Sequence, residues 1–258
     1  MMFEPIESYI LYKYREDSGF TEDIIKNHAL WFSSPLAFND PFDCWSVVGY
    51  ATDEQKNQTM DRLAQEYPFV KDVYSKSPGI VKNCLVPQKL KTCADNVFSQ
   101  IRICSFSQNY NNIIMWSHYA QEHTGLCFMF DFSEDLLFLK FCSKVNYVSK
   151  ITPSNALSDE GRKKLIKECV LSKYKDWSYE EEVRIMKLGN DIQSNTNGQL
   201  VQFNPKALKK IFFGCKATET IIEKYRGLCN TKDFQHVEFY KMEQLTDGTF
   251  GLKEYRVE

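Results

Sequence analysis

Hydrophobic residues at every second position predict most of the strands of this chain. The clearest case runs from Leu126 to Phe132, where large apolar residues alternate with their neighbours. Since successive side chains of a strand point to opposite faces, this pattern is typical of a sheet with a buried face. Strands are expected at residues 9–15, 29–33, 101–107, 126–132, 145–148, 179–186, 207–214 and 237–241.

Helical patterns lie between these strands without a regular alternation. A short helix is expected at residues 21–27, where Thr21 is the candidate N-cap. A second helix is expected to begin after Asn111 or Asn112 and to end near His123. The order of elements therefore does not predict a repeated strand-helix-strand fold.

Three longer segments complete the pattern. Residues 53–100 are mostly polar with apolar residues at helical spacing, so we expect a helical insertion or a lid there. Residues 34–44 contain two prolines and an Asn-Asp-Pro turn, which predicts an ordered loop. Residues 159–175 predict a basic amphipathic helix.

The fold class follows from the mixture of these elements. No internal repeat, low-complexity segment or flexible linker divides the 258 residues. Neither of the glycine-rich motifs of dinucleotide-binding and P-loop folds is present. We therefore expect one α+β domain, residues 1–258, with a split or strongly bent mixed or antiparallel sheet flanked by helices.

Composition and charge exclude several classes of function. The net charge is −2 and no long run of like charges occurs, which argues against non-specific binding to duplex nucleic acid. The acidic N-terminus does not resemble an export signal, and the longest apolar stretches are too short to span a bilayer. Nine cysteines without a C-x-x-C pair favour reduced thiols in the cytoplasm and no structural zinc.

The motif WSYEEEVRI concentrates charge near the end of the predicted sheet. If residues 179–186 form a strand, Glu180, Glu182 and Arg184 share one face. This arrangement favours a catalytic carboxylate beside a second acid and a positioning cation. A solvated ladder of ion pairs on an open sheet face is an equally good interpretation.

The motif MWSHYAQEH is a second candidate. On a helix, His118 and Glu122 are one turn apart, and Trp116 and Tyr119 lie on neighbouring faces. His118 and His123 are five residues apart, so they do not share a face as zinc ligands of a helix do. An alternative is that Trp116 lies in the core and His118 makes a local hydrogen bond.

Two further motifs carry charged side chains. In LYKYR, Lys13 and Arg15 lie opposite the tyrosines and are suited to binding a phosphate, although a charged strand end is the simpler interpretation. In FNDPFD, Asn39, Asp40 and Asp43 are suited either to ligand contact or to closing a turn.

These motifs together resemble a known family. In order, the segments YKYR, LWFSSPLAFNDPFD, CSFSQNYNNIIMWSHYAQEHTGLCFMFD and WSYEEEVRI resemble the bacterial family called domain of unknown function 2971, from about Leu11 to Ile185. KALKKIFFG is a weaker part of the resemblance. More distantly, the chain resembles ADP-ribosyltransferases, whose α+β fold carries an Arg or His on the first strand, a Ser or Tyr on a middle strand and a Glu on a late strand.

The second resemblance implies a set of site residues. The catalytic glutamate would be Glu182, with Glu180 two residues before it. The residues that would contact NAD are Arg15 or Lys13, Ser33 or Ser105, Asn39, Phe42, Trp116, His118, Tyr119 and Arg184, among which Trp116, Tyr119 or Phe42 would stack on the nicotinamide ring.

The implied function is NAD-dependent ADP-ribosyl transfer to a protein or nucleic acid. NAD would be a substrate, with no metal and no membrane contact. The protein would act in the bacterial cytoplasm, or in the cytosol of a target cell, as a toxin, effector or antiviral defence factor with a neutralising partner protein. Two other hypotheses are a non-catalytic partner-binding or regulatory module, and a metal-dependent nuclease or hydrolase that uses Asp40, Asp43, His118 and Glu182.

Overall fold

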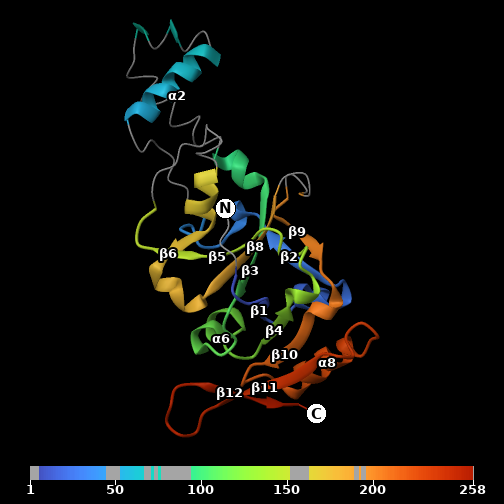
Figure 1. The fold of residues 1–258 in the computed structure, drawn as a ribbon. Helices are drawn as coiled ribbons and strands as arrows, with labels where there is room; N and C mark the ends of the chain where they lie inside the picture. Colours follow the sequence, from blue (N-terminus) through green and yellow to red (C-terminus); the bar gives the residue numbers. More distant parts are fainter. Residues whose placement is uncertain are drawn as a thin grey trace.

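A large mixed sheet forms the centre of the molecule (Figure 1). The computed structural model describes residues 6–44, 53–66, 71–72, 75–76, 94–151, 163–188, 192 and 196–257. The strands of this sheet are β1 (Ile10–Arg15), β2 (Ala29–Ser33), β3 (Ile101–Ser107), β4 (Leu126–Asp131), β5 (Cys142–Lys144), β8 (Glu182–Leu188), β9 (Gly198–Gln202), β10 (Leu208–Phe213), β11 (Glu238–Gln244) and β12 (Leu252–Arg256). A separate parallel pair consists of β6 (Asn146–Val148) and β7 (Ser172–Tyr174).

The sheet runs in the order β12, β11, β10, β4, β1, β3, β2, β9, and β8 pairs with both β3 and β5. β10 and β11 are parallel and are connected through helix α8 (Glu219–Cys229), while the other strand pairs of this sheet are antiparallel. Parallel neighbours need such a crossover because a short turn cannot return the chain to the same end of the sheet.

Strand β3 is the place where the sheet divides. One edge of β3 pairs with β8 along its whole length. The other edge is shared, because β1 pairs with it at Tyr12 and Ser107, while β2 pairs with it at Ser33 and Ile103. A strand has only two hydrogen-bonding edges, so β1 and β2 must occupy different ends of the same edge. The two halves of the sheet therefore separate alongside β3.

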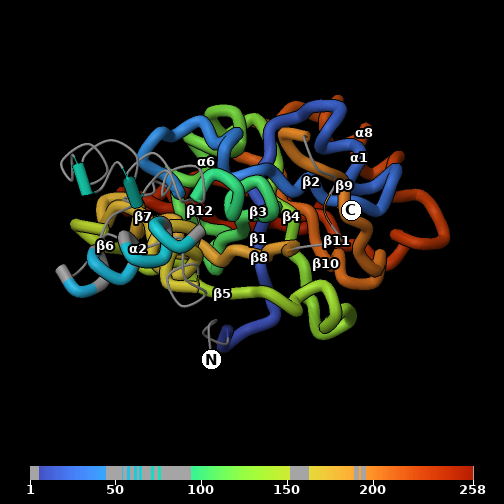
Figure 2. Tube along the Cα trace, turned by 90° about the horizontal axis from the view of Figure 1, so that it is seen from above, coloured from blue at the N-terminus to red at the C-terminus, as the bar shows by residue number. Residues whose placement is uncertain are grey.

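Helices cover both faces of the part of the sheet that contains β1, β4 and β10. On one face, α1 (Gly19–Lys26) and α8 pack side chains such as Ile24 and Ile222 against Phe128 and Phe213. Figure 2 shows α1 and α8 side by side, and Lys224 of α8 joins them through its contact with Glu22, 2.7 Å from the carboxylate. Most of the buried aromatic residues belong to this layer.

Helix α6 (Ile113–Tyr119) covers the opposite face. Its Trp116 is completely buried against Tyr14, Cys127 and Phe212. The indole N–H donates a hydrogen bond of 2.8 Å to the carbonyl of Tyr110, so the polar atom of this core residue is satisfied.

The predicted mixture of a large sheet and several helices is confirmed, but element boundaries differ. Helix α1 begins at Gly19, one residue after Ser18, and Thr21 is not its N-cap; the buried Thr21 hydroxyl donates to the carbonyl of Glu16. Helix α6 ends at Tyr119 rather than near His123. The cause is three consecutive left-handed residues, 121–123, which a right-handed helix cannot contain.

Other predictions fall partly outside the described residues. From the expected helical insertion, the structure describes α2 (Asp53–Glu66), which lies at one end of the molecule (Figure 1), and a helix at residues 94–99. The side chains of Met60 and Leu63, and residues 77–93, lie outside the described residues, so a lid stays a prediction. The described part of the helix expected at residues 159–175 ends at Val170, and β7 follows it.

Several short elements were not predicted from the sequence pattern. They are β5, β7, β9, β12 and α8, together with short 3-10 helices at Pro35–Ala37, Phe132–Glu134, Lys175–Glu180 and Pro205–Ala207 and a π-helical turn at Ile166–Val170. A signal for α8 was present, because Thr218 caps it and Glu219 lies in its first turn.

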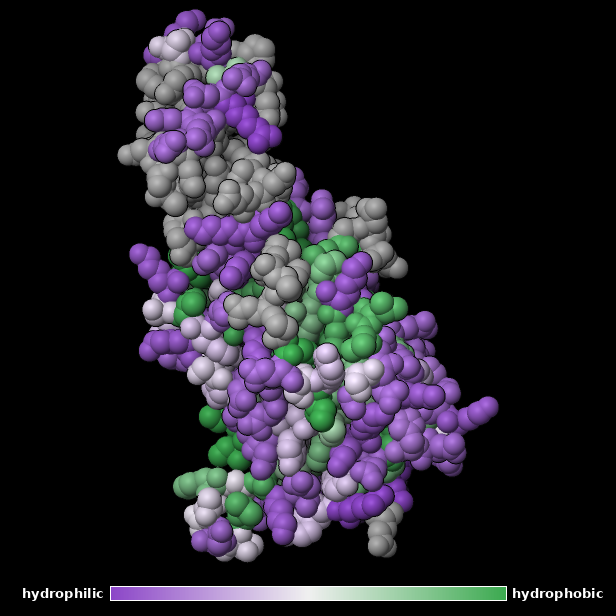
Figure 3. Space-filling view, in the orientation of Figure 1, coloured by the Kyte–Doolittle hydropathy of each residue, from purple (hydrophilic) through white to green (hydrophobic). Residues whose placement is uncertain are grey.

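The surface is largely hydrophilic on the face that Figure 3 shows, with hydrophobic residues gathered near the middle of that face. Among the described helices, none is long and apolar enough to cross a membrane. The seven described cysteines are free thiols, and most of them are buried.

The left-handed turn after α6 makes a testable prediction at Gly125. A Cβ atom there would lie 2.3 Å from the carbonyl oxygen of Arg15, so Gly125→Ala is expected to lower the free energy of unfolding by about 2 kcal/mol. The matched control is Gly227→Ala in α8, where a Cβ meets nothing within 4 Å and alanine favours the helix. Urea denaturation of both variants tests this prediction. If Gly125→Ala were as stable as wild type, the close approach of residue 125 to the Arg15 carbonyl oxygen would be contradicted.

Candidate active site

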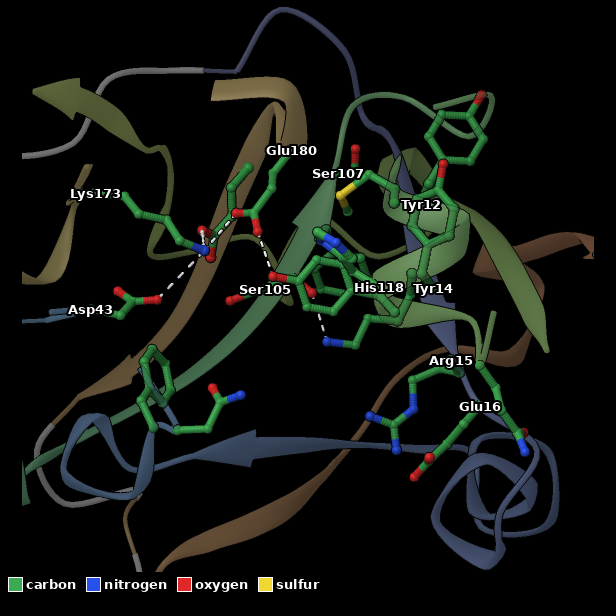
Figure 4. A pocket seen from close by; sticks show the side chains of 18 residues that line it. Tyr12, Tyr14, Arg15, Glu16, Asp43, Ser105, Ser107, His118, Lys173 and Glu180 are labelled. Carbon is green, nitrogen blue, oxygen red and sulfur yellow. Dashed lines mark hydrogen bonds and ion pairs between the residues drawn. The ribbon is translucent and has the colours of Figure 1, made fainter. Parts of the chain in front are cut away.

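A cleft of about 540 Å³ lies where β1 and β3 separate (Figure 4). One wall consists of residues 12–15 of β1 and of Glu16, which follows this strand. Another wall consists of residues 105–107 of β3. The remaining lining residues are Phe38, Asn39 and Asp43 after β2, Met115, His118, Tyr119 and Gln121 in and after α6, and Lys173, Glu180 and Glu182 at one end. The division of the sheet therefore creates the cleft and brings distant parts of the chain to it.

Lys173 lies among three carboxylates at one end of the cleft (Figure 4). Its ammonium nitrogen is 2.5 Å from Glu180 Oε2, 3.3 Å from Glu182 Oε2 and 3.6 Å from Asp43 Oδ2. The ammonium group also lies 5.1 Å from the centre of the Trp177 ring. All three charged partners are at least nine-tenths buried, so these contacts are weakly screened by solvent.

Arg184 supports the same carboxylates from the interior. It is completely buried, and its Nη2 atom is 2.6 Å from Asp43 Oδ1 and its Nε atom 2.8 Å from Glu182 Oε1. It also donates to the carbonyl of Val170 at 2.6 Å and lies 3.2 Å from Cys44 Sγ. Three separate parts of the chain are therefore joined through one guanidinium group.

Two tyrosines complete the contacts of the glutamates. The Tyr119 hydroxyl donates to Glu180 Oε1 at 2.5 Å. The backbone N–H of Glu182 donates to the Tyr147 hydroxyl at 2.8 Å. Both glutamates are thus held in position before any ligand binds.

The two glutamates differ in their acidity. Burial raises the pKa of Glu180, which Lys173 opposes and the neighbouring Glu182 reinforces. Burial alone would also raise the pKa of Glu182, but Arg184 and Lys173 outweigh it and lower that pKa to about 2. Such opposite shifts in neighbouring carboxyl groups are typical of sites in which the two groups perform different chemical tasks.

Two cations from β1, Lys13 and Arg15, also line the cleft. Arg15 lies at the opposite end from Lys173, with Glu16 beside it (Figure 4). The ammonium of Lys13 donates to the carbonyl of Ser105 at 2.6 Å, across the gap between β1 and β3. Arg15 Nε donates to the Thr21 hydroxyl at 3.3 Å, which orients the guanidinium group.

The backbone around the glutamates differs from the predicted strand. Residues 175–180 form a 3-10 helix, Glu181 is left-handed with φ 45°, and β8 begins only at Glu182. The strand predicted at residues 179–186 is thus wrong at its start. Glu180 and Glu182 still converge on Lys173, and both are buried rather than part of a solvated ladder.

The structure brings most of the predicted site residues to one cleft. Those that line it are Lys13, Arg15, Asn39, Ser105, His118, Tyr119, Glu180 and Glu182. His118 Nδ1 lies 3.1 Å from the Tyr179 hydroxyl, so His118 has a hydrogen-bond partner, but this partner is distant in the sequence rather than local.

Four predicted residues do not line the cleft. Trp116 is in the core, so it is not placed to stack on a ligand there, and Arg184 lies behind the carboxylates. The Ser33 hydroxyl accepts a hydrogen bond from the Trp31 indole. Phe42 is exposed and lines a separate cavity of about 150 Å³ on the other side of Lys173.

The sequence pattern did not indicate Lys173 and Tyr147 as site residues. Lys173 was assigned to the end of a helix, whereas it lies in β7, paired with Tyr147 of β6. Alternation in the short segment SKY gives too little signal to distinguish these cases. Among the described residues, no group of three or more His, Cys, Asp or Glu side chains is arranged to hold a metal ion.

A protein-family model described as a protein of unknown function (DUF2971) matches residues 115–185. The match runs from α6 to the first half of β8, and it includes Tyr119, Lys173, Glu180 and Glu182. The predicted resemblance to this family is confirmed over these residues. No curated protein and no solved structure matches the chain.

Replacing Glu182 tests the buried charge cluster. Glu182→Gln leaves two buried cations without one of their partners, so the free energy of unfolding is expected to fall by about 3 to 5 kcal/mol at neutral pH. The pKa of Glu182 is lowered from its ordinary value of 4.5 to about 2 in the folded protein. The ionised carboxylate therefore stabilises the fold fully above pH 4.5, and this stabilisation is lost as the pH falls toward 2. The difference between wild type and variant should therefore shrink over this range.

Urea denaturation at a series of pH values measures this difference. The matched control is Glu181→Gln, because the Glu181 carboxylate accepts a hydrogen bond from Asn109 at the surface, and an amide oxygen can accept the same bond. A constant difference between wild type and Glu182→Gln from neutral pH to pH 2 would contradict the assigned acidity of Glu182.

Proposed function

We propose that the cleft binds NAD and breaks the bond between nicotinamide and ribose, transferring ADP-ribose to a nucleophile. The main observation behind this proposal is the pair Glu180 and Glu182, two neighbouring carboxyl groups at one end of a cleft whose pKa values are shifted in opposite directions. Arg15 of β1 lies at the opposite end of this cleft (Figure 4), and Lys13 also lines it.

The charges along the cleft match the charges of NAD. The nicotinamide ring of NAD is positively charged, and its pyrophosphate is negatively charged. Three carboxylates against the two cations Lys173 and Arg184 leave one negative charge in excess at one end when all are ionised. Lys13 and Arg15 are suited to the pyrophosphate, for which lysine and arginine are common partners.

The chemistry needs a group that stabilises positive charge on the ribose. When the glycosidic C–N bond breaks, both bonding electrons leave with nicotinamide, which becomes neutral, and the ribose carbon becomes oxocarbenium-like. Glu182, which its low pKa keeps ionised at neutral pH, is suited to stabilise this cation. The nucleophile then forms the new bond to this carbon and loses its proton.

The positions of the strands support the same proposal. The resemblance to ADP-ribosyltransferases implies functional residues on a first, a middle and a late strand. Arg15 on β1, Ser105 on β3 and Glu182 on β8 line one cleft, and the last two strands are neighbours. An ADP-ribosyltransferase-like fold is part of this proposal, as is a protein or nucleic acid as acceptor.

The metal-dependent alternative is less well supported by the contacts. Two of its four expected ligands, Asp43 and Glu182, already contact both Arg184 and Lys173, and a metal ion would have to compete with these cations. The alternative of a non-catalytic binding module differs from our proposal in its outcome, because it predicts binding without turnover.

The first test measures nicotinamide release from NAD by wild type, Glu182→Gln and the control Glu181→Gln. We expect release by wild type and by the control, and a loss of at least about 100-fold for Glu182→Gln, since a group that stabilises the transition state is removed. Calorimetric titration with NAD and circular dichroism establish that the variant is folded and still binds. Release at the wild-type rate by Glu182→Gln, or no NAD binding by wild type, would contradict the proposal.

The second test concerns the basic end of the cleft. Arg15→Gln removes a cation that we place at the pyrophosphate, so KM for NAD is expected to rise by roughly tenfold or more with a smaller change in kcat. Arg226→Gln, an exposed position on α8, is the control. An unchanged KM for Arg15→Gln would show that the pyrophosphate binds elsewhere.

A further inference from the structure

We propose that Lys173 is a positioning residue that orients Glu180 beside Glu182 and favours its ionised form. This inference rests on the proposed function, because it assigns a task to a residue of the same cleft that touches no reacting atom. Its consequence is that the pH range of activity depends on a lysine that is not itself catalytic.

The distribution of cations between the glutamates carries the argument. Arg184 contacts Glu182 and Asp43, and these two carboxylates keep a cationic partner if Lys173 is removed. For Glu180, the cation found among its described contacts is Lys173, at 2.5 Å. Without the ammonium group, Glu180 would therefore be a buried carboxylate next to the negative charge of Glu182.

Lys173 is held in place by its surroundings. It lies in β7, whose backbone pairs with Tyr147 of β6, and its ammonium lies over the ring of Trp177. The side chain is buried, and three carboxylates surround the ammonium group. Its position is thus fixed by packing and by charge, as expected for a group that orients others.

The charged and titratable groups near Glu180 come from several elements of the chain. They are Lys173 of β7, Glu182 of β8 with Arg184 behind it, Asp43 after β2, Tyr119 of α6, Tyr147 of β6 and Tyr179 on its own segment. Tyr119 donates a hydrogen bond, but it carries no positive charge to compensate the repulsion between the two carboxylates.

The experiment compares Lys173→Met, Lys173→Arg and the control Lys175→Met in the full chain. Lys175 is exposed and its nearest acidic partner is Asp176, so this control removes a lysine two residues away without touching the cleft. Carbon-13 NMR titration follows the glutamate carboxyl groups, with Glu180→Gln used to assign the Glu180 signal. The pH profile of nicotinamide release is measured for the same proteins.

We expect the titration midpoint of Glu180 in Lys173→Met to rise by at least about one pH unit, since an opposite charge at this distance shifts a pKa by about one to three units. The pH at which nicotinamide release reaches half of its maximum should rise together with this midpoint. Lys173→Arg should restore most of the wild-type profile, whereas a purely structural role of Lys173 predicts lower activity at every pH. An unchanged midpoint and profile in Lys173→Met would overturn the proposal.

A double variant keeps the proposal testable if Lys173→Met is unstable. Lys173→Met with Glu180→Gln removes both members of the pair, so no unpaired carboxylate stays buried, and we expect it to be more stable than Lys173→Met alone. If Lys173→Met and the double variant were equally stable, the pairing of Lys173 with Glu180 would be overturned. If wild type releases no nicotinamide while the Glu180 midpoint shifts as expected, the proposed function fails and the role of Lys173 in holding Glu180 ionised stands.

Discussion

The buried contact between Arg184 and its carboxylates is the constraint on which the candidate site depends. A guanidinium group in the interior loses its hydration, and that loss is offset only if charged partners and hydrogen-bond acceptors surround it. Here Asp43, Glu182 and the carbonyl of Val170 fill this role. They come from the segment after β2, from β8 and from the turn before β7. These three parts of the chain therefore meet at one guanidinium group, and the acidic end of the cleft lies where they meet.

The division of the sheet at β3 gives this cluster access to solvent. If β1 continued to pair with β3 beyond Tyr12 and Ser107, backbone hydrogen bonds would close the gap that the cleft occupies. Lys13 instead donates to the carbonyl of Ser105 across that gap, which satisfies a backbone acceptor left without a strand partner. The irregular pairing of the sheet is therefore a structural requirement of the cleft, and the side chains beside it compensate for the lost backbone bonds.

Local patterns predicted many of the described strands, missed β5, β7, β9 and β12, and indicated the site only in part. β3 and β4, which are buried along most of their length, were predicted nearly to the residue, because strand composition is a property of a few neighbouring residues. The end of α6 and the start of β8 were not, because the left-handed residues there are held by contacts with distant segments. Lys173 could not be connected with Glu180 from the sequence, since β7 is too short for a distinct pattern and the cluster assembles only through tertiary packing.

The unequal sharing of cations explains how two adjacent glutamates acquire different properties. Glu182 has Arg184 and Lys173 as partners, and their charges lower its pKa to about 2. Glu180 has Lys173 and the neutral Tyr119, so burial and its neighbour dominate and its acidity falls. The sequence E-E-E therefore contains three carboxylates with three different environments, because Glu181 points to the surface. A site of this kind follows from where the backbone directs each side chain, more than from the identity of the residues themselves.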